Sequence, residues 1–117
     1  MRQYWLTNPA QADLGAIIDQ ITPVNKQGAR NVVHALEEHL DWLAATSAYR
    51  PKIYMSHRGY DIHRASFGLQ GRYDRYEFFF ILREEDVVAI ACDYAQGAPE
   101  RVRAHVAGAI EASETEL

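Results

Sequence analysis

The stretch from Arg75 to Ala95 constrains the fold most, because it contains two dense apolar runs separated by a short charged segment. The first run, Tyr76 to Leu82, is aromatic and aliphatic, and the second, Val87 to Cys92, is rich in small and β-branched residues. Runs of this kind, bounded by charge, predict two β-strands joined by a turn at residues 83–86. Both alternate faces are mostly apolar, so the sheet must be covered at least in part on each side.

Two amphipathic helices are predicted in the first half of the chain. The first starts with Asn8 as its cap and Pro9 at the first helical position, and Thr22-Pro23 ends it. The second begins near Asn25. Apolar residues recur at helical spacing in both, namely Ala10, Leu14, Ile17, Ile18 and Ile21 in the first, and Ala29, Val32, Val33, Leu36, Leu40, Leu43 and Ala44 in the second. The tight link between them predicts an antiparallel hairpin whose apolar stripes cover the sheet.

Shorter segments complete the predicted order of elements, which is β-α-α-β-β-β-α. Residues 3–7 are expected to form a strand that pairs with the central hairpin. A loop follows the second helix and runs to about Gly59, and Tyr60 to Phe67 is a weaker strand. Pro99 opens a third helix, whose apolar stripe is Val102, Val106, Ala109 and Ile110.

Length sets the domain organisation. A chain of 117 residues is long enough for one core but not for two, so we predict a single domain over residues 1–117. The expected class is α+β, with an antiparallel sheet, the helical hairpin packed on one face, and the third helix near the sheet edge. The other face of the central strands is expected to be covered by this helix or by a partner chain. Residues 111–117 are acidic and are predicted to form a frayed tail.

The composition excludes several classes of protein. An apolar content of 48% and a charged content of 24% are typical of a soluble globular domain, and no signal peptide or membrane span is expected. A single cysteine, Cys92, excludes an intramolecular disulfide and a zinc site built from cysteines, and it is expected to be a core residue in a reducing cytoplasm. The net charge of −4 argues against broad binding to polyanions but permits a local basic face.

Four segments carry a resemblance to a known family. They are Tyr4 to Leu14, with its Ala-x-x-Asp-Leu helix start; Ala29 to Ala45, closing on Trp42-Leu43-Ala44; Gly59-Tyr60 with the strand that follows; and the central strand pair, Tyr76-Glu77-Phe78-Phe79-Phe80 followed by Asp86-Val87-Val88-Ala89-Ile90. In this order and spacing, over roughly residues 3–95, they resemble the RelE/ParE superfamily of bacterial toxin–antitoxin modules, and most closely its ParE branch of plasmid stabilisation toxins.

The resemblance implies a small cytoplasmic toxin that a cognate antitoxin neutralises by wrapping around it. In the ParE branch the target is DNA gyrase, and the toxin is not known for chemistry of its own. In the RelE branch the toxin cuts messenger RNA on the ribosome without a metal, using basic side chains on the sheet and a terminal Tyr or His. Neither branch implies a cofactor or a membrane, DNA contact would be indirect through the antitoxin, and a homodimer is possible.

The residues needed for RNA cleavage are incomplete. Metal-free cleavage needs a general base near the 2′-hydroxyl and cations against the phosphate. If the chain were an endonuclease, the catalytic candidates would be His63, Arg75 and Arg83. Three acidic residues, however, stand at or beside positions where the resemblance calls for cations: Asp61, Glu77 and Asp93. We therefore expect a toxin that acts by binding, with the endonuclease and a toxin-derived, non-toxic binding module as the alternatives.

A basic and aromatic rim is the predicted partner surface. Its members are Arg64, Arg72, Tyr73, Arg75 and Tyr76. Arginines beside tyrosines suit a protein interface, and an antitoxin tail along the sheet would cover them. The alternative is that these arginines are solvated and form weak surface pairs with nearby acids at Asp61, Asp74 and Glu77.

The segment from His34 to His39 suggests a metal site at first sight, because it resembles the metal-binding helix of a zinc protease. Its two histidines are five residues apart, so on a helix they point roughly 140° away from each other. The spacing of four residues that allows two histidines to chelate one ion is absent. We predict no metal site here.

Overall fold

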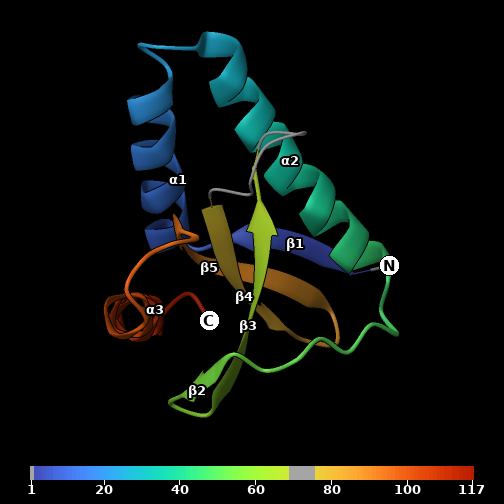
Figure 1. Cartoon of the computed structure of the whole chain (residues 1–117). Helices are drawn as coiled ribbons and strands as arrows, with labels where there is room; N and C mark the ends of the chain where they lie inside the picture. The colour runs from blue at the N-terminus through green and yellow to red at the C-terminus, as the bar shows by residue number, and fades with distance from the viewer. Residues whose placement is uncertain (1, 69–75) are drawn as a thin grey trace.

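The central strands are apolar on both faces, and the structure covers both. The computed structural model describes residues 2–68 and 76–117, and it has the α+β class and the predicted order of elements (Figure 1). The elements are β1 (Gln3–Leu6), α1 (Asn8–Ile21), α2 (Lys26–Ala45), β2 (Met55–His57), β3 (Tyr60–Phe67), β4 (Tyr76–Leu82), β5 (Asp86–Tyr94) and α3 (Pro99–Ala112).

The five strands form one sheet in the order β1-β5-β4-β3-β2. The predicted central hairpin is β4 and β5, which pair antiparallel with Phe78 opposite Cys92. β3 pairs antiparallel with β4, while β1 adds to the other side of β5 in parallel, with Tyr4 opposite Val87. The predicted antiparallel sheet is therefore confirmed, except at its β1 edge.

β2 was not predicted, because its residues were expected to lie in a loop. It is three residues long and pairs only with the start of β3, with Met55 opposite Ile62 and His57 opposite Tyr60. Two residues join the strands, Arg58 and Gly59, and both have positive φ angles of 50° and 83°. Such a backbone matches the two-residue turns that close twisted hairpins, and glycine favours it. The run is too short for its alternation of buried and exposed residues to show in the sequence.

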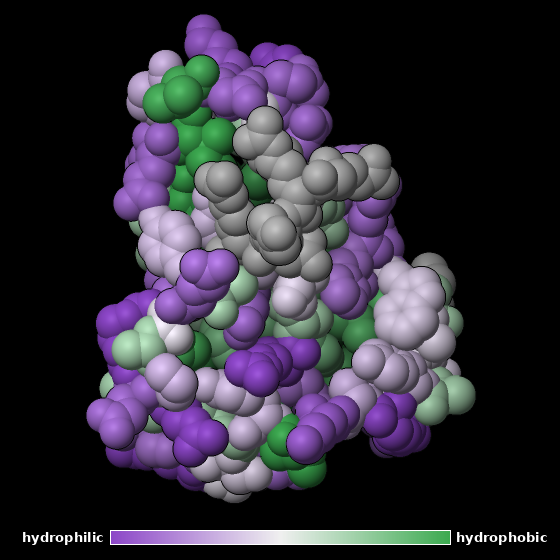
Figure 2. Space-filling view, in the orientation of Figure 1, coloured by the Kyte–Doolittle hydropathy of each residue, from purple (hydrophilic) through white to green (hydrophobic). Residues whose placement is uncertain are grey.

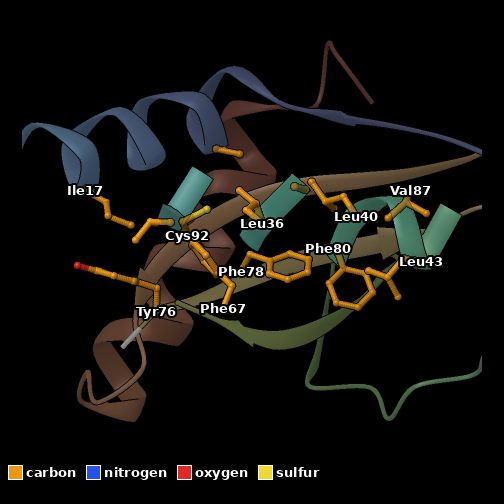
Figure 3. Packing of buried hydrophobic residues seen from close by; sticks show 13 residues of the cluster. Ile17, Leu36, Leu40, Leu43, Phe67, Tyr76, Phe78, Phe80, Val87 and Cys92 are labelled. Atoms are coloured by element: carbon orange, nitrogen blue, oxygen red, sulfur yellow. The ribbon is translucent and has the colours of Figure 1, made fainter. Parts of the chain in front are cut away.

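The α1–α2 hairpin packs on one face of the sheet, as predicted (Figure 3). The core on this side joins the two helical stripes to alternate residues of β3, β4 and β5. Its fully buried members include Leu36, Leu40, Leu43, Phe78, Phe80 and Val87. Leu14 packs against this cluster and is partly buried.

α3 packs on the opposite face rather than near the sheet edge, so that part of the prediction was wrong. Its stripe of Val102, Val106, Ala109 and Ile110 is buried as predicted, in a second cluster with Ile62, Phe79, Ile81, Val88, Ile90 and Ala91. The reason is the double-sided apolar character of β4 and β5, because an uncovered face of this kind would remain in water. The sheet is thus the middle of three layers.

The N-cap of α1 is Thr7 and not Asn8 as predicted. The Thr7 hydroxyl accepts a hydrogen bond from the Ala10 amide at 3.3 Å, and Thr7 is fully buried. Asn8 is the first helical residue, and its amide donates to the Glu116 carboxylate at 3.0 Å. Both threonine and asparagine occur as helix caps, so the sequence alone does not decide which of the two residues occupies the cap position.

The acidic C-terminal segment makes specific contacts, in contrast to the frayed tail that we expected. Glu111 and Glu114 both pair with Arg58 in the β2–β3 turn, at 2.9 and 2.6 Å. The Leu117 carbonyl accepts from Arg83 at 2.9 Å, and Ser113 is buried. The charges that made this segment look disordered therefore have partners on the sheet.

Candidate functional site

A groove of about 650 Å³ lies where the segment before β2, the strands β3 and β4, and the start of α3 meet. We call it the Tyr54 groove, and the residues used below are Tyr49, Lys52, Ile53, Tyr54, Arg64, Glu77 and Arg103. Tyr49 and Ile53 are exposed apolar residues at its rim. The surface view looks mostly hydrophilic on this side of the molecule, with hydrophobic residues gathered over the α1–α2 hairpin (Figure 2).

Two guanidinium groups lie over the Tyr54 ring. Arg64 on β3 is 4.7 Å from the centroid of the ring, and Arg103 on α3 is 5.8 Å from it. Guanidinium groups at these distances are attracted to the electron-rich face of the ring, by about 0.5–1 kcal/mol at exposed sites. Tyr54 also contacts Phe79 in the second core, so the sheet supports the ring from beneath. The Tyr54 ring therefore packs on the second core and has two cations close to it.

Among the described residues that line the Tyr54 groove, Glu77 is the one carboxylate. Burial raises the pKa of Glu77, the nearby charge of Asp93 raises it further, and Arg64 opposes both. The Arg64–Glu77 contact is 3.8 Å and the Arg64 side chain is 54% exposed, so this ion pair contributes little. The described residues of the Tyr54 groove have a positive balance, with Lys52, Arg64 and Arg103 against Glu77.

Next to the Tyr54 groove, a cluster of charged residues joins α1, β5 and α3. The His105 Nδ1 lies 2.6 Å from Asp93 Oδ2, and its Nε2 lies 2.9 Å from Asp13 Oδ2. Arg101 donates to both oxygens of Asp93 at 2.9 Å, and the Cys92 amide donates to Asp13 at 3.0 Å. We call these residues, Asp13, Asp93, Arg101 and His105, the His105 cluster.

Hydrogen bonding sets the protonation of the His105 cluster. The bond to Asp13 raises the pKa of His105, and the bond to Asp93 raises it further, to about 9. Burial alone would raise the pKa of Asp93, but hydrogen bonds from Arg101, His105 and the Tyr94 amide outweigh burial and lower it. An imidazolium whose two N–H groups both donate to carboxylates has no lone pair with which to accept a proton. The His105 cluster therefore links three elements and does not provide a general base.

Two catalytic candidates of the endonuclease reading, His63 and Arg83, line a second cavity and not the Tyr54 groove. His63 is buried on the opposite face from Arg64, because neighbouring residues in a strand point to opposite sides. Its ring packs against Phe80, and its Nδ1 lies 3.0 Å from the Lys52 carbonyl. Arg83 is held by Asp86 through two hydrogen bonds of 2.7 Å. Arg75 lies outside the described residues.

The predicted partner surface is represented by Arg64 alone among the described residues. Arg64 is exposed in the Tyr54 groove, as a partner contact requires. Tyr76 is only 8% exposed and packs in the first core against Phe67 and Tyr94, so its predicted place on the surface was wrong. The alternation of β4 explains this, since Tyr76 shares a face with Phe78 and Phe80. The others, Arg72, Tyr73 and Arg75, lie outside the described residues.

The outer edge of β3 is open beyond β2. The Ile62 carbonyl accepts from the Tyr54 amide, so alternate residues of β3 direct their main-chain groups away from β4. The next two such residues are Arg64 and Ser66, and within residues 2–68 and 76–117 neither has a main-chain partner on that side. Both are exposed. An edge of this kind can accept another extended chain.

The sequence reasoning missed Tyr54, Lys52 and Arg103 in the groove and Asp13 and His105 in the charged cluster. Tyr54 and Lys52 belong to the segment taken for a plain loop, where no periodicity marks them. Asp13 and His105 are 92 positions apart and meet only through the packing of α1 and α3 on β5. No local pattern could have joined them.

Comparisons of the chain with protein-family models, with curated proteins and with solved structures find no match. Within the described part of the chain, no group of three or more histidine, cysteine or carboxylate side chains is placed to hold a metal ion. Among the described helices, none has the length and apolar character that a bilayer crossing requires.

Proposed function

We propose that this chain is the toxin of a type II toxin–antitoxin module of the ParE-like kind. It would act in the cytoplasm by binding DNA gyrase, and a cognate antitoxin would neutralise it. The proposal rests on the resemblance of four sequence segments and on the order of elements that they imply, which is a fold-level analogy. The observation in its favour at the level of a site is the open edge of β3 beside the positively charged Tyr54 groove.

The Tyr54 groove suits binding better than RNA cleavage. A cleavage site needs a base and unpaired cations around one point. Here Glu77 lies in the groove itself, and His105 is held between two carboxylates next to it. His63 is on the opposite face of the sheet. Two of the three cations that the described residues place in the groove, Arg64 and Arg103, lie over an aromatic ring, which is an arrangement that protein interfaces use for anchoring.

The antitoxin would engage this surface with an extended acidic segment. Its main chain would pair with Arg64 and Ser66 at the β3 edge, in the manner of an added strand. Its acidic side chains would face Arg64 and Arg103, and an apolar side chain would cover Tyr49 and Ile53 at the rim. Any contact with DNA would then be made by the antitoxin and not by this chain.

Expression in a bacterial host tests the proposal. Growth arrest with DNA damage, together with inhibition of gyrase supercoiling by the purified protein, is the expected result. A rapid loss of translation would instead support the endonuclease, and unimpaired growth would support a non-toxic binding module. Either outcome contradicts gyrase poisoning.

The binding surface is tested separately, with the product of an adjacent reading frame that has a ribbon-helix-helix pattern. Replacing Arg64 and Arg103 by alanine should weaken its binding at least about tenfold, because two charged contacts are lost. Arg30→Ala changes an exposed arginine of α2 outside the Tyr54 groove and should leave the affinity unchanged. Equal affinities for the double variant and the wild type would remove the Tyr54 groove from the interface.

A further inference from the structure

A second cavity, of about 810 Å³, is rich in cationic side chains. It lies between the start of β1, the chain after α2, the start of β3 and the turn between β4 and β5. The residues that bear on its chemistry are Arg2, Arg50, Tyr60, Asp61, His63 and Arg83. We call it the Arg2 cavity. Of these residues, none lines the Tyr54 groove.

Arg2 is a buried cation without a carboxylate partner among the described residues. It is 8% exposed, and its guanidinium donates only to main-chain carbonyls, at 2.8 Å to Leu43, 3.3 Å to Thr46 and 3.4 Å to Arg83. The Leu43 carbonyl is at the C-terminal end of α2, which carries about half a negative charge. The positive charge of Arg2 is therefore only partly balanced, and its buried Nε has no hydrogen-bond partner in the described structure.

Some charged side chains of the Arg2 cavity already have a partner of opposite charge, and others do not. Arg83 is engaged, because Asp86 holds it through two hydrogen bonds. Arg50 is exposed and donates only to the Ser47 and Tyr49 carbonyls. The Asp61 carboxylate accepts from the Ser56 hydroxyl at 2.6 Å, so part of its capacity is used. Two guanidinium groups, those of Arg2 and Arg50, thus remain without a carboxylate in the described structure.

His63 adds a third polar group to the Arg2 cavity. Its Nδ1 lies 3.0 Å from the Lys52 carbonyl, so Nδ1 carries the proton and donates, because a carbonyl can only accept. In this neutral tautomer Nε2 carries the lone pair and can accept a hydrogen bond. Two carboxylates line the cavity among the described residues, Asp61 and Glu84, and both are exposed, so an anion must approach Arg2 and Arg50 away from them.

We propose that the Arg2 cavity binds the phosphate group of a small phosphorylated ligand. Guanidinium groups match the oxygens of a phosphate and donate to it in pairs, and the partial burial of Arg2 strengthens the attraction. The guanidinium group of Arg2, which lines the cavity, and the free donors of Arg50 supply the contacts. The volume exceeds that of a phosphate ion, and the half-buried Tyr60 ring offers the rest of the ligand an aromatic wall.

The probes are inorganic phosphate and adenosine monophosphate, with adenosine as the uncharged comparison. Titration calorimetry and the arginine Nε–Hε signals in ¹⁵N–¹H spectra are measured on the full chain. Adenosine monophosphate should bind, adenosine should not, and the Arg2 Nε–Hε signal should shift on addition of phosphate. No heat and no shift at millimolar probe would overturn the proposal.

Variants separate this site from general charge attraction. Arg50→Gln changes an exposed side chain and should reduce the affinity about tenfold, because it removes one charged donor group. Arg30→Gln removes the same charge from α2, outside the cavity, and should change the affinity less than twofold. Equal losses in the two variants would overturn the proposal. Arg2→Lys keeps the positive charge but lacks the paired N–H donors of a guanidinium group, so it should weaken binding. If this variant does not fold, the affinity of Arg50→Gln and the Arg2 Nε–Hε signal of the wild type test the proposal.

Discussion

His105 should make the stability of the fold depend on pH in the alkaline range. Its pKa is raised from 6.5 to about 9 by the bonds to Asp13 and Asp93. A group whose folded pKa is raised stabilises the fold fully below its unfolded pKa, and that contribution is lost as the pH rises through its folded pKa. The window here is therefore from about pH 6.5 to about pH 9.

The size of the effect follows from the shift. Each unit of pKa corresponds to about 1.4 kcal/mol, so a rise to about 9 gives at most roughly 3 kcal/mol. The His105 side chain is 29% exposed, and screening by solvent reduces this to about 2 kcal/mol. We expect the free energy of unfolding of the wild type to fall by about that amount from pH 6 to pH 9.5, relative to His105→Gln.

Urea unfolding, followed by tryptophan fluorescence at several pH values, measures this difference. Burial raises the pKa of Cys92 to about 12, so its thiol ionises more readily in the unfolded chain and weakens the fold at high pH. This contribution is the same in the wild type and the variant, so it cancels in the comparison. His34→Gln is the matched control, because His34 lies on the exposed side of α2 and pairs only with Glu38. Parallel pH profiles for the wild type and His105→Gln, or an NMR titration of His105 below pH 7, would refute the reasoning.

Two further predictions test single assignments. Thr7→Ala should lower the free energy of unfolding by about 1 kcal/mol, because it removes the cap of α1, whereas Asn8→Ala should change it by only a few tenths. If urea unfolding gave comparable losses for the two variants, the assignment of the cap to Thr7 would be wrong. Cys92 should resist iodoacetamide in the native protein at pH 8 and react in urea, because burial raises the pKa of its thiol to about 12. Rapid labelling of the folded chain, detected by mass spectrometry, would contradict the buried position.

Periodicity was sufficient to predict most of the fold. The stripes at Leu36 and Val106 and the alternation of Phe78 and Phe80 are local patterns, and each predicted a buried face that the structure contains. The position of α3 was not predictable in the same way. The apolar stripe of α3 shows that the helix packs against another apolar surface, but it does not show which one. The helix packs on the face of the sheet and not at its edge because β4 and β5 have a second apolar face, with Phe79 at its centre.

The site was predicted less well, because its members come from separate elements. The surface position of Arg64 was predicted, because an arginine in a predicted strand indicates the face that is exposed to solvent. Tyr54 and Arg103 were missed, because they become neighbours of Arg64 only when β2 and α3 are in place. Tyr76 was assigned to the surface because it follows the arginine-rich segment, yet the register with Phe67 turns its ring into the core.

The buried acid of β5, Asp93, bears on the choice between RNA cleavage and binding. Asp93 is buried at 4% side-chain exposure, and two of the three cations of α3, Arg101 and His105, are bonded to it. Releasing them would leave a buried carboxylate unpaired, which costs several kcal/mol. A phosphate could therefore not recruit these cations without destabilising the contact between β5 and α3. On the face covered by α3, Arg101 and His105 are thus committed to holding the fold, while Arg64 and Arg103 lie over the Tyr54 ring, which favours recognition through these two arginines and the open edge of β3.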